Sequence, residues 1–491
     1  MRISSLFEWA ALARTHVRAC GLAAAGVASL LGCSGPIELE SAGPPNIILC
    51  MADDQGWGDV AYNGHPVLQT PHLDALSESG LRFDHFYAAA PVCSPTRASV
   101  LTGRHPNRMG CFQWGHSLRP QEVTLAESLR ARGYVTGHFG KWHLGSVQKG
   151  SPVNPGASGF DHWFSAPNFF DNDPILSREG VAVQTQGESS MVTVDAALEF
   201  IRSHAGSGQP FFAVVWFGSP HSPHHAAEED RSLYPDQPPE LQNFYGEISG
   251  MDRAIGKLRG ELRNLGINGH TILWYCSDNG GLPSLGSTGG RGHKGDIYEG
   301  GLRVPAVLEW PDRIPEHRRI DLPAGTADIF PTLLELAGEI QGSRVPLDGV
   351  SLVPLLDEDM PERPSPIGFW DYPAPGLRTP SAEWMAELLA SQAQGRETTE
   401  PERLRLDAGE IERQYPEDTF PGHSAWLDWP WKLHRIESES REVSFELYHL
   451  EEDPEEQADL AEAEQARVAS MRQELEEWLQ SVVASLNGED Y

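Results

Sequence analysis

Two pairs of polar residues in this sequence can supply oxygen ligands to a cation. Asp53 and Asp54 directly follow one continuous apolar run, and Asp278 and Asn279 directly follow another. Adjacent carboxylates beside a buried strand are costly unless a cation neutralises them. Three carboxylates and one amide oxygen favour Ca²⁺ or Mg²⁺ over zinc. A solvated turn is the alternative for a lone Asp-Asp pair, but the repeated placement favours a metal site.

Cys93 is the candidate nucleophile, in the pattern Cys-x-Pro-x-Arg over residues 93–97. Pro95 can open a helix at its first turn. Arg97 then lies one helical turn from Cys93 on the same face. A buried structural cysteine is the alternative. The six cysteines contain no CxxC pair, so neither a zinc site nor a disulfide framework is indicated.

Basic and imidazole side chains could hold an anion next to these groups. Lys141 and His143 lie two residues apart on a predicted strand and therefore on one face, although a surface strand would show the same pattern. His221 follows an apolar run. Its protonated form can give a proton to a leaving alkoxide near neutral pH. His224 and His225 could reach a leaving-group sugar, but we interpret them as exposed loop histidines.

These residues carry a resemblance to a known family. Residues 93–104 (CSPTRASVLTGR) resemble the sulfatase signature, residues 292–305 resemble the family's second long signature, and residues 220–223 resemble its Pro-His-x-Pro motif. The resemblance covers residues 45–310 by motif. It implies that a maturase oxidises Cys93 to Cα-formylglycine. It also implies that Asp53, Asp54, Asp278 and Asn279 bind one Ca²⁺ or Mg²⁺, with the modified Cys93 completing the shell.

The resemblance also implies roles for the remaining candidates. Arg97, Lys141, His143, His221 and Lys294 are expected around the formylglycine and the sulfate. An aldehyde hydrate offers two geminal hydroxyls: one attacks sulfur, and the other expels sulfate when the aldehyde reforms. In this mechanism Asp278 helps deprotonate the attacking hydroxyl, His221 or Lys294 protonates the leaving alcohol, and His143 takes the last proton. Glu299 and Arg303 are expected to fix the glycine-rich loop.

Alternating strand and helix patterns indicate an α/β fold with a large doubly wound sheet. The expected strands cover residues 46–51, 135–143, 211–217, 271–276 and 304–310, and the helices 125–130, 191–203 and 245–265. Ligands bind beyond the carboxyl ends of the strands in such sheets, where the polar residues stand. The resemblance implies a mixed, alkaline phosphatase-like sheet flanked by helices.

The chain changes character after about residue 350. We expect a catalytic domain at 45–350 and a C-terminal subdomain at 351–491. Short alternating segments at 425–427, 431–434, 443–445 and 447–448 predict a small antiparallel sheet, and 463–486 predicts a final helix. Residues 372–422 are expected to form a long excursion with one helical piece at 384–389.

The first residues resemble an export signal. Arg2, Arg14 and Arg18 precede the apolar run 19–31, a secretory pattern. The run ends Leu-Leu-Gly-Cys33, which is similar to a bacterial lipoprotein processing site, although a plain signal peptide is the alternative. We therefore expect a signal at 1–33, a linker at 34–44, and an exported protein, periplasmic or anchored to the outer membrane through a lipid on Cys33.

Charge limits the partners. The chain has 37 Lys+Arg, 70 Asp+Glu and a formal net charge of −33, which argues against nucleic acid. Any anion site must be a local basic pocket, and Arg97, Lys141, Lys294 and Arg291 are the candidate cations. The arginines of the excursion (Arg396, Arg403, Arg405, Arg413) are offset by glutamates nearby. This distribution predicts exo action on a terminal sulfated sugar of short oligosaccharides.

The predicted function is hydrolysis of sulfate esters, those of a sulfated carbohydrate in particular. Residues 300–306 are similar to bacterial relatives of N-acetylgalactosamine-6-sulfatases. A phosphomonoesterase or phosphodiesterase of the same fold is one alternative. It would need a Ser or Thr nucleophile, such as Ser94 or Thr96, and further Asp/His ligands for paired zinc, which are not evident. A lipoprotein that binds sulfated glycans without turnover is another, but it would not explain Cys93.

Overall fold

The computed structural model describes residues 43–338, 345–397, 400–411, 413–438 and 440–491. They belong to one compact unit, Gly43–Tyr491. The expected signal, with Cys33, lies outside the described residues. Within the described ranges, no helix has the length and apolarity needed to cross a membrane.

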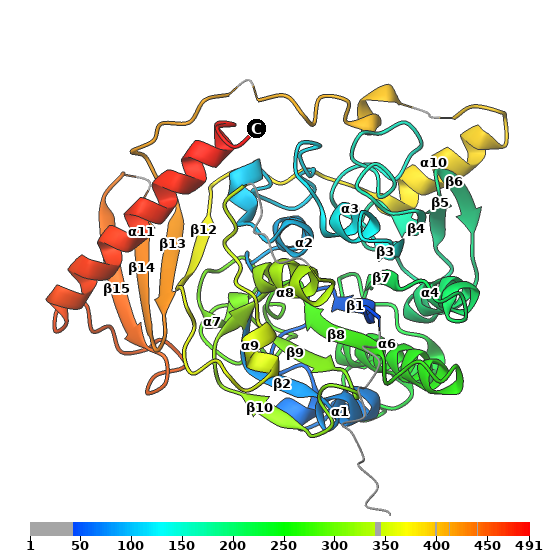
Figure 1. Ribbon diagram of the computed structural model, residues 1–491, viewed down its shortest axis with the longest axis horizontal. Coiled ribbons are helices and arrows are strands. Elements are labelled where there is room, and N and C mark those ends of the chain that lie inside the picture. The colour runs from blue at the N-terminus through cyan, green and yellow to red at the C-terminus, as the bar shows by residue number, and fades with distance from the viewer. Residues whose placement is uncertain (1–42, 339–344, 398–399, 412, 439) are drawn as a thin grey trace, which may run out of the picture. The chain divides into compact units, whose positions relative to one another are not determined.

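Eleven strands of the described chain form one mixed sheet (Figure 1). They are β1 (Asn46–Ala52), β2 (Leu81–Tyr87), β3 (Val135–Lys141), β4 (His162–Ala166), β5 (Ile175–Arg178), β6 (Val181–Gln184), β7 (Phe211–Trp216), β8 (Thr271–Ser277), β9 (Arg303–Glu309), β10 (Arg318–Ile320) and β11 (Ala324–Gly325). The order is β10-β2-β9-β8-β1-β7-β3-β4-β5-β6, and β11 pairs with β2. Strands β8, β1, β7 and β3 are neighbours and all run parallel. Their carboxyl ends therefore meet at one edge of the sheet.

Helices cover both faces of this sheet (Figure 1). They are α1 (Pro71–Ser77), α2 (Cys93–Thr102), α3 (Leu125–Arg130), α4 (Ser189–His204), α5 (Glu228–Arg231), α6 (Pro239–Asn264), α7 (Glu299–Leu302), α8 (Ile329–Leu336) and α9 (Val353–Leu356). Side chains alternate along β1: Ile47 and Leu49 pack with the layer of α2, α3 and α8, whereas Ile48 and Cys50 pack with α1, α4 and α6. Strands buried on both faces explain the continuous apolar runs.

A separate four-stranded antiparallel sheet follows, in the order β12-β13-β14-β15. Its strands are β12 (Ile367–Asp371), β13 (His423–Asp428), β14 (Trp431–Glu437) and β15 (Val443–His449), and the helices of this part are α10 (Ser381–Gln392) and α11 (Gln465–Leu486). One face packs on α11 through Leu433, Leu447 and Leu479. The other face packs against the larger sheet, where Phe369 joins Tyr87 and Leu302.

The predicted fold class is confirmed: a large mixed sheet flanked by helices, with a small antiparallel sheet after it. Several details differ from the expectation, and strands β2, β4, β5, β6, β10 and β11 have no expected counterpart. Strand β3 ends at Lys141 rather than at His143. The segments 443–445 and 447–448 form the single strand β15. Strand β12 was not expected; it forms because residues 367–371 pair with β13, a distant partner that local pattern does not reveal.

Candidate functional site

The four parallel strands β8, β1, β7 and β3 deliver the predicted polar residues to one place. Asp53 and Asp54 follow β1, Asp278 and Asn279 follow β8, and Lys141 is the last residue of β3. Each of these side chains is fully buried. His221 lies a few residues beyond β7, and its Nε2 is 3.7 Å from Asp54 Oδ2. The adjacency of the strands therefore explains why residues far apart in sequence form one cluster.

Each carboxylate of the Asp53–Asp54 pair accepts hydrogen bonds from a different lysine. Lys141 Nζ donates to both oxygens of Asp53, at 2.9 and 2.7 Å. Lys294 Nζ donates to both oxygens of Asp54, at 2.6 and 2.7 Å. Burial and neighbouring carboxylates raise the pKa of Asp53 despite Lys141. The pKa of Asp54 is lowered because Lys294 and His221 outweigh the effect of burial.

Arg97 joins helix α2 to the same cluster. Its Nε and Nη2 donate to Asp278 Oδ2 at 3.0 and 2.6 Å, and its guanidinium carbon lies 5.1 Å from the ring centroid of Trp216. Asp278 Oδ1 in turn accepts from the amide of Asp54 at 3.1 Å. Burying an ion pair is costly unless further hydrogen bonds satisfy both groups. Here the additional bonds fix Arg97 one turn from Cys93, as the sequence predicted.

Cys93 is the first residue of α2 and is buried. Burial raises the pKa of its thiol to about 12, so the unmodified side chain is a protonated thiol at neutral pH. The other described cysteines, Cys50, Cys111 and Cys276, are also buried and free.

The donor set fits a hard cation. Ligand atoms of Asp53, Asp54, Cys93 and His221 all lie within 4.8 Å of one another, and this is the one such group among the described residues. Asn279 Oδ1 is buried without a hydrogen-bond partner in the described part of the chain. Its Nδ2 donates to Asp54 at 2.9 Å, so the free oxygen belongs to the same cluster. Carboxylate and amide oxygens suit Ca²⁺ or Mg²⁺, whereas Asp278 is held by Arg97.

The two histidines of the cluster are both neutral at pH 7. Burial, followed by Lys141 and Arg97, lowers the pKa of His143 well below its usual value. Its two ring nitrogens have no hydrogen-bond partner among the described residues. Burial lowers the pKa of His221 to about 3. His221 Nδ1 is 2.6 Å from Ser222 O, so Nδ1 carries the proton and Nε2 is an acceptor.

The predicted placement of Lys141 and His143 on one face of a strand is wrong. His143 follows the end of β3 and has a positive φ of 54°, so it does not share a strand face with Lys141. It still lies near the cluster, because the distant residues Arg97, His221 and Lys294 also lower its pKa.

The loop that carries Lys294 is fixed by backbone contacts. Lys294 N donates to Gly281 O at 2.9 Å, and Gly280 N donates to Gly301 O at 2.9 Å. A Cβ on Gly280 would lie 2.0 Å from Gly300 O. Next in the loop, Glu299 Oε1 accepts from Lys432 Nζ at 3.0 Å. This backbone clasp holds Lys294 next to the residues that follow β8.

Two arginines near the loop, Arg303 and Arg291, have partners outside the catalytic cluster. Arg303 Nε donates to Asp84 O of β2 at 2.8 Å, so this bond joins the start of β9 to β2, and the role of Arg303 in fixing the loop stays a prediction. Arg291 is not available as a site cation, because it bonds Tyr448 at 2.9 Å and stacks on Tyr298. The arginine pattern alone could not reveal distant partners such as Tyr448 on β15 and Asp84 on β2.

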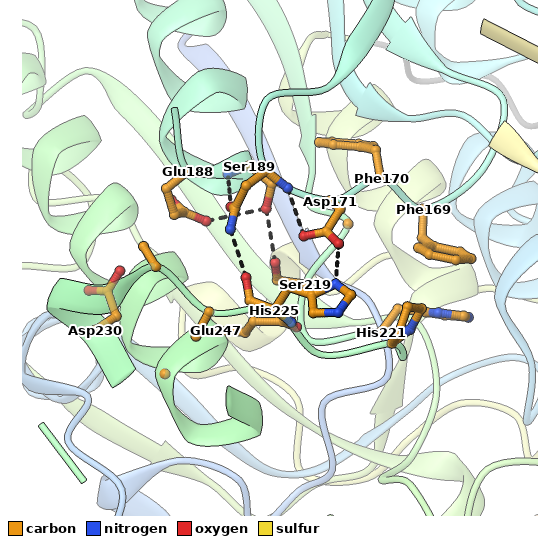
Figure 2. A pocket seen from close by; sticks show the side chains of 16 residues that line it. Phe169, Phe170, Asp171, Glu188, Ser189, Ser219, His221, His225, Asp230 and Glu247 are labelled. Carbon is orange, nitrogen blue, oxygen red and sulfur yellow. Dashed lines mark hydrogen bonds and ion pairs between the residues drawn. The ribbon is translucent and has the colours of Figure 1, made fainter. Parts of the chain in front are cut away.

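A small cavity lies beside His221 (Figure 2). Its volume of about 10 Å³ leaves room for about one water molecule. His225 is exposed, as expected, and pairs with Asp171 at its wall. His224, in contrast, is only partly exposed, and its Nδ1 lies 3.4 Å from Glu247 Oε2. Phe169, which the sequence analysis missed, stacks on His221 with 4.3 Å between ring centroids.

Solved structures share this architecture. The crystal structure of Ps i-CgsB in complex with k-i-k-neocarrahexaose superposes with a TM-score of 0.74 at 24% identity, covering 89% of this chain and 93% of that one. Another structure, solved with its substrate D-glucosamine-2-N,6-O-disulfate, gives a TM-score of 0.70 at 19% identity, with 91% and 99% coverage. At 24% and 19% identity, these likenesses show the fold alone.

Comparison of the sequence with known proteins shows the family to which the chain belongs. The family model named Sulfatase matches residues 45–339. N-acetylgalactosamine-6-sulfatase of Mus musculus is 32% identical over 381 residues, which span 68% of this chain and 71% of the mouse protein. The chain belongs to the sulfatase family and is a sulfuric ester hydrolase.

Proposed function

We propose that this enzyme hydrolyses sulfate esters of a carbohydrate, with a formylglycine made from Cys93 and one Ca²⁺ or Mg²⁺ ion. The observation that carries the proposal is the position of Cys93. It begins α2 inside a cluster of three carboxylates and three cations, with Arg97 one turn away. A sulfate ester anion needs such local positive charge in a protein with a net charge of −33.

The residues of the cluster would hold both the ion and the sulfate. Asp53, Asp54, Asn279 and modified Cys93 would bind the cation, with Asp278 beside them. A bound cation would polarise the sulfate and acidify a hydroxyl of the formylglycine hydrate. Lys141, Lys294 and Arg97 would surround the charge that develops on the sulfate oxygens, the usual main source of such catalysis.

Proton transfers can be assigned to different side chains. The leaving alcohol needs a proton donor. Neutral His221 is unsuited because its proton lies on Nδ1, bonded to Ser222 O. Lys294 is charged, since Asp54 raises its pKa against the effect of burial, and we assign it the donor role. His143, neutral and without a partner among the described residues, is suited to accept the proton whose loss releases sulfate. Asp278 is assigned to the attacking hydroxyl.

A sulfated carbohydrate is the substrate class we favour. The mouse relative is named for N-acetylgalactosamine-6-sulfate, and one structural neighbour was solved with a glucosamine disulfate as its substrate. The leader pattern at residues 1–33 supports export to the periplasm or outer membrane, where such polymers are met. A maturase that oxidises Cys93 would then be the required protein partner.

The test combines mass spectrometry with activity. A tryptic peptide containing residue 93 should carry an aldehyde in place of the thiol, and the same preparation should release sulfate from sulfated sugars. An active preparation with a wholly unmodified Cys93 would overturn the formylglycine mechanism. A modified protein that binds sulfated sugars without releasing sulfate would support the binding-protein alternative instead.

A further inference from the structure

A cavity of about 260 Å³ lies next to the proposed active site. Its walls come from three parts of the chain: the segment after His143, the segment around Leu377, and α10 with the turn that follows it. It is large enough for a sugar ring, unlike the cavity of about 10 Å³ beside His221.

Three of its wall residues are close to the catalytic cluster in sequence or through a hydrogen bond. Gly115 lines the cavity, and its amide donates to the hydroxyl of Ser94, the neighbour of Cys93, at 2.9 Å. Gly145 also lines it, two residues after His143. Pro167, a third wall residue, is two residues before Phe169, which stacks on His221. A substrate held at Cys93 therefore has this cavity as a neighbour.

Arg378 is the cavity's available cation. Two other arginines line the same cavity, but Arg403 pairs with Glu387 at 2.6 Å and Arg405 approaches Asp407 at 3.5 Å. Arg378 is exposed and has no hydrogen bond or ion pair within the described ranges. Backbone bonds fix both of its neighbours: Leu377 N donates to Trp114 O at 2.8 Å, and Thr379 O accepts from Asn168 at 3.1 Å. The residue is thus presented on a fixed segment.

Parts of the remaining lining, which also includes Glu400 and Glu402, suit a sugar. Gln148 is 6% exposed, and its Oε1 has no partner in the described part of the molecule. A buried amide oxygen without a partner is unfavourable, and a sugar hydroxyl could donate to it. Trp384 and Leu377, the latter 41% exposed, offer apolar surface to the C–H face of a ring.

We propose that this cavity binds the sugar next to the sulfated one, and that Arg378 recognises an anionic group on that second sugar. The inference rests on the proposed function and names its specificity. Terminal sulfate would lie at Cys93, and a carboxylate or second sulfate would accept a charge-assisted bond from Arg378. Gln148 would accept from a hydroxyl of the same ring.

The experiment compares substrates with and without the second sugar. Wild type is first screened on sulfated disaccharides in which the neighbouring sugar carries a carboxylate or a second sulfate. The fastest one is then used with its monosaccharide and with a version lacking the second anion, by carboxyl reduction or desulfation. 4-Nitrophenyl sulfate serves as a substrate with no second sugar. The variants are Arg378→Ala and, as a matched loss of charge outside the cavity, Arg396→Ala.

We expect Arg378→Ala to raise KM for the disaccharide about tenfold with kcat little changed. Removing the second anion should raise the wild-type KM similarly and have no effect in Arg378→Ala. Whichever anion shows this loss identifies the group that Arg378 binds. The monosaccharide, 4-nitrophenyl sulfate and Arg396→Ala should show no change.

An unchanged disaccharide KM in Arg378→Ala, or an equal rise with the monosaccharide, would overturn the inference while leaving the proposed function intact. If wild type cleaves no sulfate ester at all, the proposed function fails first, and the inference fails with it.

Discussion

The reactivity of Cys93 depends on whether the proposed oxidation to formylglycine takes place. Burial raises the pKa of the thiol to about 12, and the thiolate is the nucleophilic form of cysteine. An unmodified Cys93 would therefore be a poor nucleophile at neutral pH. Oxidation to an aldehyde removes this difficulty, because the hydrate offers hydroxyl groups rather than a thiolate.

Replacing Cys93 should separate activity from folding. Cys93→Ala removes only a buried sulfur atom, so we expect a stability loss of at most about 1–2 kcal/mol and no detectable sulfate release. Cys93→Ser should behave the same way unless the host has a Ser-type maturase. The measurements are sulfate release and thermal unfolding of protein purified free of host enzymes. Activity retained in Cys93→Ala would rule out the assigned nucleophile.

Removing the cation should affect both turnover and stability. Prolonged chelation should abolish activity, and Ca²⁺ or Mg²⁺ should restore it. If the proposed ion binds only the folded chain, a free concentration 100 times Kd should add about 2.7 kcal/mol to the free energy of unfolding. Asp54→Asn should lose most of this increment, whereas Asp195→Asn, an exposed carboxylate on α4, should keep it.

The readout is the change in Tm on adding each ion to chelated protein. Elemental analysis that found two zinc ions per chain would favour the phosphatase alternative. An equal Tm shift in wild type and Asp54→Asn would exclude the ligand assignment.

Much of the site could be predicted from residue types alone. Asp53, Asp54 and Asp278 directly follow strands that are recognisable as apolar runs, and parallel strands bring such ends together. Phe169 and Arg378 could not be found this way. Their position next to His221 or the cavity depends on loops that return from elsewhere, and nothing in the local sequence marks those contacts.

At the scale of elements, a buried ionic network connects β14 to the loop that carries Lys294. Lys432 Nζ lies 3.0 Å from both Glu299 and Glu456, and Glu456 also accepts from the amide of Glu299 at 2.7 Å. All three side chains are fully or almost fully buried. The small sheet thus contributes directly to the position of the loop.

Lys432→Met should be strongly destabilising, because it leaves two carboxylates buried without their cation. Losing one partner of a buried pair costs about 3–5 kcal/mol. Adding Glu299→Gln should recover part of this loss. The control is Lys257→Met, whose lysine is partly exposed and whose surface ion pair contributes about 0–1 kcal/mol. Urea unfolding measures all four proteins, and equal losses at both lysines would refute the network's role.

His434, on the same strand, should make stability depend on pH. Burial, followed by Lys432, lowers its pKa well below the usual value, so the folded state keeps it neutral. Below pH about 6.5 the unfolded chain binds a proton that the folded chain does not. Its contribution is therefore complete above that pH and is lost as the pH falls, by about 1.4 kcal/mol per unit.

His434→Gln should reduce this slope, whatever its effect on stability at pH 8. The measurement is the urea midpoint of both proteins at pH 8, 6.5 and 5.5. Parallel pH profiles for wild type and His434→Gln would show that His434 is protonated in the folded chain.

Helices and strands could be predicted where the hydrophobic period and the length of the segment were clear, but the residues at which they end could not. Helix α3 has a capping box between Thr124 and Glu127, a signal written in the sequence. The sequence carries no such signal at the end of β3. Gly140 has a φ of 98° and His143 a φ of 54°, and these positive values result from the turn of the chain into the site. The alternating pattern therefore predicts a strand that is two residues longer than β3.

For the whole molecule, the net charge of −33 should govern access by polyanions. Like charges slow encounter at long range, and salt screens them beyond about 8–10 Å. We expect exo cleavage of short oligosaccharides, with rates on long polysulfated chains rising with ionic strength. The comparison is a sulfated disaccharide against its parent polymer at low and high salt. Faster cleavage of internal sulfates in the polymer at low salt would contradict both expectations.

The backbone clasp of the Lys294 loop divides the molecule into a part that tolerates change and a part that does not. A side chain at Gly280 would meet Gly300 O at 2.0 Å, so the loop has no space to accept new bulk. In contrast, α10 and the segment 377–379 form part of the wall of the cavity around Arg378, and both lie at the surface. Substitutions in that outer segment alone could therefore change which alcohol's sulfate ester is accepted, while the residues proposed to bind the sulfate stay the same.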